Sequence, residues 1–398
     1  MTSKTFLSAI SVVINLCSNV AFSQGNWTQK ANFGGTARLG AVSFSIGTKG
    51  FIGAGYSAQS NSVFGDFWEW DQTTNVWTQK ANFGGGPRGW AVGFSIGPRG
   101  FVGTGFDLAQ TLSDFWEYDT TANTWTQKAA FPGSAASETV GFSIGSQGYI
   151  LGGNYDFWAY DTTLDSWSQK GNYAGSGIGA QVGFSIGTKG YIGTGQDNSG
   201  NIQYKDFWEY DPANNTWTQK ANVGGSVRTA AVGFAIGTKG YIGTGATSVS
   251  NTFRDFWEFD PQNNSWTAVT NFGGTARWVA TGFSIGGKGY LGTGFDNAGD
   301  KKDFWEFTPS GVGIDELSLE NSISIYPTPA ATILYLKSSA FEVSYITIYN
   351  LEGEKIMSCP KAGFNNTIDV SELESGIYLV EVMLQGKGMI KKKVSIIK

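Results

Sequence analysis

The sequence predicts an all-β fold built from repeated four-stranded units, and three observations lead to this prediction. Three short motifs recur six times each, Gly and aromatic residues are abundant (57 Gly and 15% aromatic residues), and only 15% of the residues are charged. This composition suits short strands joined by tight turns, and it is typical of neither helices nor disordered chains.

The motifs recur at intervals of about 42 to 50 residues, a period that indicates a propeller or another array of strands. A Trp-containing segment begins at Trp27, Trp77, Trp125, Trp167, Trp217 and Trp266; an Asp-Phe-Trp segment begins at Asp66, Asp114, Asp156, Asp206, Asp255 and Asp303; and a motif of the type Phe-Ser-Ile-Gly stands at Phe44, Phe94, Phe142, Phe184, Phe234 and Phe283.

Each unit resolves into four expected strands separated by Gly-rich or Asn-rich turns, and side chains alternate between two faces as in a strand: Trp208 and Tyr210 share one face. The chain opens with a lone fourth strand at Trp27 and closes with the first three strands of a unit, ending at Phe307. We therefore expect a six-bladed β-propeller over residues 24–309, closed by the N-terminal strand, which leaves no open seam.

Over roughly residues 25–309 the chain resembles the kelch-repeat β-propeller family. The resemblance rests on the aromatic residue before a Gly pair in Tyr149–Gly153, on an aromatic-Asp pair such as Tyr118-Asp119, and on the Trp of the fourth strand. Five units replace the first Gly of the pair, as in Thr194-Gly195. The resemblance implies a six-bladed kelch-like propeller.

The first 23 residues have the pattern of a secretory signal: an early Lys4, an apolar stretch, and a small-x-small site that predicts cleavage between Ser23 and Gln24. A buried N-terminal strand is the alternative. Cleavage would remove Cys17 and leave Cys359 without a partner for an internal disulfide. No other apolar run is long enough to cross a bilayer, so we expect no transmembrane segment in the mature chain.

After Pro309 the repeat stops. Residues 310–319 are expected to be a linker, and residues 320–398 alternate as the strands of a small β-sandwich. This segment resembles the type A C-terminal sorting domain of the type IX secretion system, on the positions Tyr326, Pro327, Pro329, Gly353, Gly376, Tyr378, Lys391, Lys392 and Lys393, although Thr328 replaces the family's usual Asn. The resemblance implies the type IX secretion machinery as a partner. It also implies a product that is secreted or held on the outer-membrane surface of a Gram-negative, Bacteroidetes-like bacterium. A passive accessory β-sandwich is the alternative.

Composition excludes several functions. The chain has no His, which removes a Ser-His-Asp triad and His-ligated zinc or copper sites. Its net charge is −5 without a long basic run, so we expect no nucleic-acid partner. We expect no cofactor and no metal, with calcium at Asp197-Asn198 or at residues 296–300 as an open alternative, because both stretches carry oxygen ligands without the full loop spacing.

The loops between the second and third strands differ widely, whereas the turns at the opposite end are nearly constant, so we expect the variable face to be the binding face. Six residues before each motif Phe, four units carry an arginine: Arg38, Arg88, Arg228 and Arg277. The kelch resemblance implies that these arginines line the mouth of a pocket, where they would favour anionic ligands. The alternative is a structural ion pair inside each repeat.

At one level of the expected channel, Trp90, Glu138, Gln181 and Trp278 break the repeat. Aromatic planes beside polar groups suit a sugar or a peptide side chain; the alternative is that both Trp residues plug the channel. We therefore expect a secreted or surface-held protein that binds a glycan or a protein, rather than an enzyme. A carbohydrate-active enzyme of the sugar mutarotase type, with Glu138 and either Arg88 or Arg228, and an extracellular structural protein are the alternatives.

Overall fold

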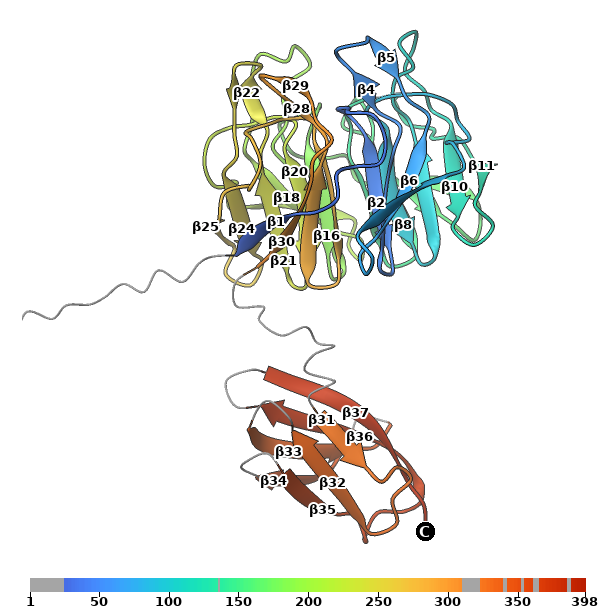
Figure 1. Cartoon of the computed structure of the whole chain (residues 1–398), viewed down its shortest axis with the longest axis vertical. Helices are drawn as coiled ribbons and strands as arrows, with labels where there is room; N and C mark the ends of the chain where they lie inside the picture. The colour runs from blue at the N-terminus through green and yellow to red at the C-terminus, as the bar shows by residue number, and fades with distance from the viewer. Residues whose placement is uncertain are drawn as a thin grey trace, which may run out of the picture. The chain divides into compact units, whose positions relative to one another are not determined.

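A computed structural model describes residues 25–134, 137–309, 323–338, 342–351, 354–360, 365–384 and 388–398. The chain divides into two compact units, with the boundary after residue 311 (Figure 1). The predicted signal cleavage at Ser23 and Gln24, the linker 310–319 and Gly353 lie outside the described residues. Within the described ranges, no helix is long and apolar enough to span a membrane.

The first unit consists of six four-stranded antiparallel sheets, which confirms the all-β prediction and is consistent with a β-propeller. The first sheet comprises β2 (Val42–Ile46), β3 (Lys49–Gly53), β6 (Phe67–Asp71) and β7 (Val76–Lys80). The second comprises β8 (Val92–Ile96), β9 (Arg99–Gly103), β10 (Phe115–Asp119) and β11 (Thr124–Lys128). The third comprises β12 (Gly141–Ile144), β13 (Gln147–Leu151), β14 (Phe157–Asp161) and β15 (Ser166–Gln169).

The remaining three sheets repeat this order. The fourth comprises β16 (Val182–Ile186), β17 (Lys189–Gly193), β18 (Phe207–Asp211) and β19 (Thr216–Lys220). The fifth comprises β20 (Val232–Ile236), β21 (Lys239–Gly243), β24 (Phe256–Asp260) and β25 (Ser265–Val269). The sixth comprises β26 (Thr281–Ile285), β27 (Lys288–Gly292), β30 (Phe304–Thr308) and β1 (Asn26–Gln29).

In the sixth sheet the N-terminal strand β1 pairs antiparallel with β30, with Trp27 opposite Phe307. Trp27 is buried and packs edge-on against Phe256 and Phe272 at ring distances of 5.1 and 5.0 Å. A strand from the start of the chain thus completes a sheet whose other strands come from the end of the unit.

Neighbouring sheets interlock through the motif Phe and a glycine. A Cβ added at Gly100 would clash with the ring of Phe44, which lies in the preceding sheet, and the same relation holds around the unit. Gly50 in the first sheet likewise makes room for Phe283 in the sixth. The glycine at the start of each second strand is therefore required by a close approach between sheets rather than by a turn.

Three short hairpins extend the loops between second and third strands: β4 (Tyr56–Ser57) with β5 (Ser62–Val63), β22 (Ala246–Ser248) with β23 (Asn251–Thr252), and β28 (Phe295–Asp296) with β29 (Gly299–Asp300). Figure 1 shows the labelled hairpin strands at one end of the first unit. This end carries the loops whose sequences vary.

The second unit contains a three-stranded and a four-stranded antiparallel sheet. The first has β31 (Ile323–Tyr326), β32 (Ile333–Ser338) and β35 (Asn365–Asp369); the second has β34 (Lys355–Pro360), β33 (Val343–Tyr349), β36 (Gly376–Leu384) and β37 (Gly388–Ile396). Leu334 and Leu336 from the first sheet join Val380 and Val382 from the second in one buried core. A small two-sheet arrangement with a shared core is consistent with the expected β-sandwich.

The described positions of the sorting motif lie in both sheets of this unit. Tyr326 ends β31 and stacks on Tyr335 at 5.7 Å, and Pro327 and Pro329 follow it directly. Gly376 and Tyr378 lie in β36, and Lys391, Lys392 and Lys393 lie in β37, where Lys391 forms an ion pair with Glu381 at 3.3 Å.

Candidate functional site

The four arginines expected at the pocket mouth lie elsewhere. Arg38, Arg88, Arg228 and Arg277 are each 0–1% exposed. Each forms a bidentate pair with the Asp of the Asp-Phe-Trp segment in its own unit: Arg38 with Asp66, Arg88 with Asp114, Arg228 with Asp255 and Arg277 with Asp303, all with N–O distances of 2.6–2.9 Å.

These pairs form because the arginine and the aspartate of a unit lie at the same end of one sheet. The arginine precedes a first strand and the aspartate precedes a third strand of the same antiparallel sheet, so both lie at one end of the unit. Arg228 Nη1 also donates to the Thr244 carbonyl at 3.0 Å, and its guanidinium lies over the ring of Phe253. None of the four arginines is among the described residues that line the pocket. The structure therefore corrects the expected arginine ring: these side chains are repeat-internal ion pairs.

A hydrogen-bonded ring lies two residues after the arginine position. One residue from each unit contributes to it, and we call these six the ring positions: Gly40, Trp90, Glu138, Ala180, Ala230 and Val279. The N–H of each donates to the carbonyl of the preceding ring position, and the N–H of Gly40 donates to Val279 at 3.1 Å, so the series returns to its start.

All six ring positions have a left-handed backbone, with φ between 51° and 60°. This conformation suits Gly40, but it is unfavourable for residues with a Cβ and most of all for the β-branched Val279. The circular hydrogen bonds stabilise the strained conformation, because each of them satisfies a backbone donor. The backbone thus places one ring position from each unit around a common point, and five of the six carry a side chain there.

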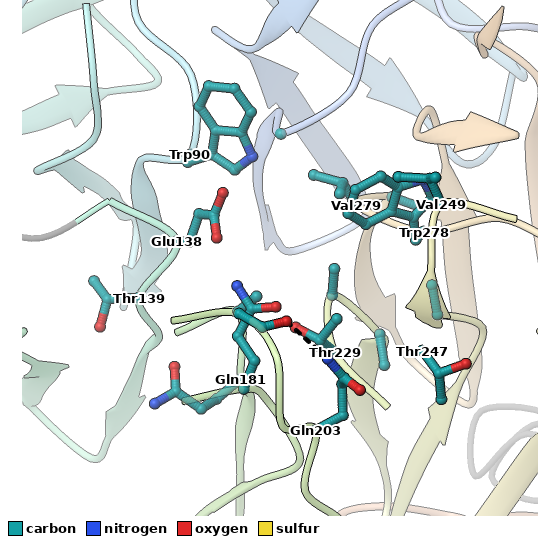
Figure 2. A pocket seen from close by; sticks show the side chains of 18 of the residues that line it. Trp90, Glu138, Thr139, Gln181, Gln203, Thr229, Thr247, Val249, Trp278 and Val279 are labelled. Carbon is teal, nitrogen blue, oxygen red and sulfur yellow. Dashed lines mark hydrogen bonds between the residues drawn. The ribbon is translucent and has the colours of Figure 1, made fainter. Parts of the chain in front are cut away.

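A pocket of about 430 Å³ lies at this point. Trp90, Glu138, Gln181 and Trp278, the residues that break the repeat, all line it (Figure 2). The structure therefore brings together four of the eight predicted binding residues. Figure 2 shows Trp90 with Glu138 on one side of the pocket and Trp278 with Val279 on another.

Variable loops supply further pocket residues that sequence reasoning did not single out. Gln196, Gly200 and Gln203 come from the loop before β18, and Thr247 and Val249 come from the loop before β24. The loop variability pointed to this face, but nothing in the sequence indicated which loop residues turn inward.

Trp90 occupies space that another ring position leaves free. A Cβ added at Gly40 would lie 3.0 Å from the indole Nε1 of Trp90. The Trp90 ring also stacks on Tyr56 at 5.2 Å with an interplanar angle of 30°. The tryptophan in one repeat and the glycine in the preceding repeat are therefore complementary, and Tyr56 holds the indole at the pocket wall.

Glu138 is the only ionisable residue among the described residues that line the pocket. Burial raises the pKa of its carboxyl, and no described residue forms a hydrogen bond or an ion pair with that carboxyl to lower the pKa again. The carboxyl therefore stands in the pocket as a single acidic group without a neighbouring cation.

Three other lining residues carry buried polar atoms that have no hydrogen-bond partner within the described ranges: Gln181 Oε1, Thr229 Oγ1 and Trp278 Nε1. The amide nitrogen of Gln181, by contrast, donates to the Gly177 carbonyl at 2.8 Å, which fixes the orientation of the side chain. Buried polar atoms without a partner are rare in folded proteins, and these three leave hydrogen-bonding capacity unused beside the pocket, although similar atoms also occur away from it, as at Thr104 and Thr244.

In the two stretches considered for calcium, the carboxylates of Asp197 and Asp296 are engaged within the protein. Asp296 forms an ion pair with Lys301 at 2.7 Å and accepts a hydrogen bond from Thr275, and Asp197 accepts bonds from Ser199 and from loop amides. Among the described residues, no group of three or more His, Cys, Asp or Glu side chains could hold a metal ion.

Comparisons with known proteins bear on both units. Residues 324–398 match the family model of the secretion system C-terminal sorting domain. No curated protein matches the sequence significantly. Among solved structures, the chain is similar to one described as "Structure of YjhT", with a TM-score of 0.62 and 15% identity, over 71% of this chain and 98% of that chain. At this identity the likeness shows the fold alone, which is propeller-like.

The sorting domain is that of the type IX secretion system, so it indicates export to the cell surface or the medium, as is typical of Bacteroidetes, and an interaction with the secretion machinery. The chain thus combines a propeller-like unit that carries a polar pocket with a C-terminal type IX sorting domain.

Proposed function

We propose that this protein is an exported binding protein whose first unit is a closed six-bladed propeller that holds a saccharide in the pocket at the ring positions. One observation carries the proposal: Trp90, Glu138, Gln181 and Trp278, from four different repeats, line a single pocket. Aromatic faces that cover the apolar side of a sugar ring, together with amide and carboxyl groups for its hydroxyls, are the chemistry that saccharide recognition needs.

The size of the pocket favours a small ligand over a protein surface. Its volume of about 430 Å³ lies within the range of roughly 300–1,000 Å³ for small-molecule sites. A stable protein partner would need roughly 800 Å² of buried surface on each side, which a pocket alone does not supply. A terminal sugar or a short glycan end therefore fits best.

A closed propeller favours saccharide binding because a rigid frame lowers the entropy that ordering a site on binding would cost. The contact of Phe283 with Gly50 and the hydrogen bond from Gly40 to Val279 join the sixth sheet to the first, and β1, which pairs with β30, precedes the first sheet along the chain. Each ring position is then joined by hydrogen bonds to the ring positions of the two neighbouring repeats.

The mutarotase-type alternative receives less support from this geometry. It pairs Glu138 with Arg88 or Arg228, but these arginines are buried against Asp114 and Asp255. Proton transfer to and from the oxygens at an anomeric centre would then have one ionisable group among the described lining residues instead of two.

The test is binding of the purified full chain to a panel of mono- and oligosaccharides, measured by calorimetry, beside Trp90→Ala and Trp278→Ala. We expect each substitution to weaken binding of the best saccharide by roughly tenfold or more, because an aromatic anchor is lost. Leu164→Ala is the control: Leu164 is 72% exposed in the turn between β14 and β15, away from the pocket, and the control should bind like the wild type. A wild-type chain that binds no saccharide, or variants that bind as well as it does, would overturn the proposal.

A further inference from the structure

The charge distribution around the pocket is one-sided. Among the described lining residues the only ionisable group is the carboxyl of Glu138, and the rest are Trp, Gln, Thr, Ser and small apolar residues. The four arginines two residues before ring positions do not offset this charge, because each is neutralised by its own aspartate, as Arg88 is by Asp114 at 2.6 and 2.9 Å. No described group in the pocket supplies a positive charge.

We propose that the saccharide bound here is an amino sugar whose primary ammonium group pairs with Glu138 between the indole faces of the pocket. This inference rests on the proposed function and names its ligand class. An ammonium donates three hydrogen bonds to oxygen acceptors and is attracted to the faces of Trp rings. The pocket offers both kinds of partner: a carboxyl without a cation, and two indoles.

The surroundings of Glu138 explain why a neutral or anionic sugar would fit less well. A buried carboxylate without a partner is destabilised, and burial accordingly raises the pKa of Glu138. A neutral sugar leaves that charge uncompensated, and an anionic sugar places a second negative charge beside it. A cationic ligand supplies the missing charge, so the carboxylate becomes an attractive group rather than an unfavourable one.

Neutral polar side chains also lie near the ring positions. Gln181 Oε1 and Thr229 Oγ1 lack hydrogen-bond partners among the described residues, and Gln181 is fixed through its amide nitrogen. Figure 2 shows Gln181 and Thr229 across the pocket from Trp90. Because both oxygens are buried, a ligand reaches them only when the side chains turn toward the pocket, so the carboxyl of Glu138 remains the principal acceptor.

The experiment compares three sugars with the same ring on the full chain: glucosamine, N-acetylglucosamine and glucuronate, by calorimetry at neutral pH. We expect glucosamine to bind roughly tenfold tighter than N-acetylglucosamine, since charge-assisted hydrogen bonds are about twice as strong as neutral ones, and glucuronate to bind weakest. In Glu138→Gln, which keeps the size of the side chain, the preference for glucosamine should fall to about one. Glu372→Gln makes the same charge change at an exposed site in the second unit and should leave the preference unchanged.

The outcomes separate this inference from the function on which it rests. Tighter binding of N-acetylglucosamine or glucuronate, or an unchanged preference in Glu138→Gln with an intact near-ultraviolet spectrum, overturns the amino-sugar inference and keeps saccharide binding. Binding of lysine amide that is stronger than that of glucosamine and is lost in Glu138→Gln overturns the saccharide and places the ammonium on a peptide. Failure of all four probes overturns the amino-sugar inference, whereas saccharide binding itself is overturned only when the wider saccharide panel also shows no binding.

Discussion

The pair between Arg228 and Asp255 allows a sharp test of how the repeats are held together. Arg228 is fully buried, and both oxygens of Asp255 accept from its guanidinium at 2.9 and 2.7 Å. Asp255→Asn removes the charge of the carboxylate while preserving its shape. Removing one partner of a buried pair costs about 3–5 kcal/mol, and we expect about 3 kcal/mol because the Asp255 side chain is 32% exposed.

The fourth repeat supplies the matched control. Asp206 occupies the position of Asp255, but Ile178 stands where the arginine would be, and Asp206 Oδ1 has no hydrogen-bond partner in the described part of the chain. Asp206→Asn therefore makes the same substitution at the same place without stranding a buried cation. Its expected cost is about 1 kcal/mol or less, the size of a single altered hydrogen bond.

The assay is equilibrium unfolding in urea, followed by tryptophan fluorescence. All 15 tryptophans lie between Trp27 and Trp305, so the signal reports on the first unit even when the second unit unfolds separately. A loss in Asp255→Asn that is below about 1 kcal/mol, or no larger than that in Asp206→Asn, would refute the view that these pairs are structural rather than ligand-binding.

Two further predictions follow from the same geometry. Burial by itself raises the pKa of Asp255 and Asp303, but the hydrogen bonds and charges of Arg228 and Arg277 outweigh it and hold each pKa below the usual value. A carboxyl whose pKa is lowered by folding stabilises the fold above its unfolded pKa of about 3.9. The free energy of unfolding should therefore fall as the pH drops below about 4, and it should fall less steeply in Asp255→Asn. An identical slope in both proteins would contradict this prediction. Gly40→Ala adds a Cβ to a residue with a left-handed backbone, 3.0 Å from the Trp90 indole. We expect urea unfolding to show a loss of about 1–2 kcal/mol and the near-ultraviolet signal of Trp90 to change. A loss of stability without a spectral change would show that the position of the indole does not depend on Gly40.

Much of the fold could be predicted from the sequence because it repeats. Six copies of each motif indicate the sheets, and the lone segment at Trp27 indicates which strand lacks neighbours in its own repeat. The convergence of Trp90 and Glu138 could also be predicted, since equivalent positions of a circular array lie at one level. A residue that departs from the repeat at this level is therefore a candidate for a binding residue.

The direction of the arginine side chains could not be predicted from the spacing of the motifs alone. An arginine at a repeated position can point to the channel or back into its own sheet, and the choice depends on an aspartate that arrives after two further strands. The left-handed backbone of the ring was equally hidden, because only Gly40 among the six residues has a type that suggests it. Backbone strain at residues other than Gly cannot be recognised from the amino-acid types at those positions.

The pairing of β1 with β30 has a consequence for the order of events during folding. Strand β1 finds its partner only when β30, the last strand of the first unit, is in place, because Asn26 lies opposite Thr308. Until then the ring has an open edge and Trp27 has no buried place. Contacts of such long sequence separation form slowly. The architecture thus makes closure of the first unit a late event in its folding.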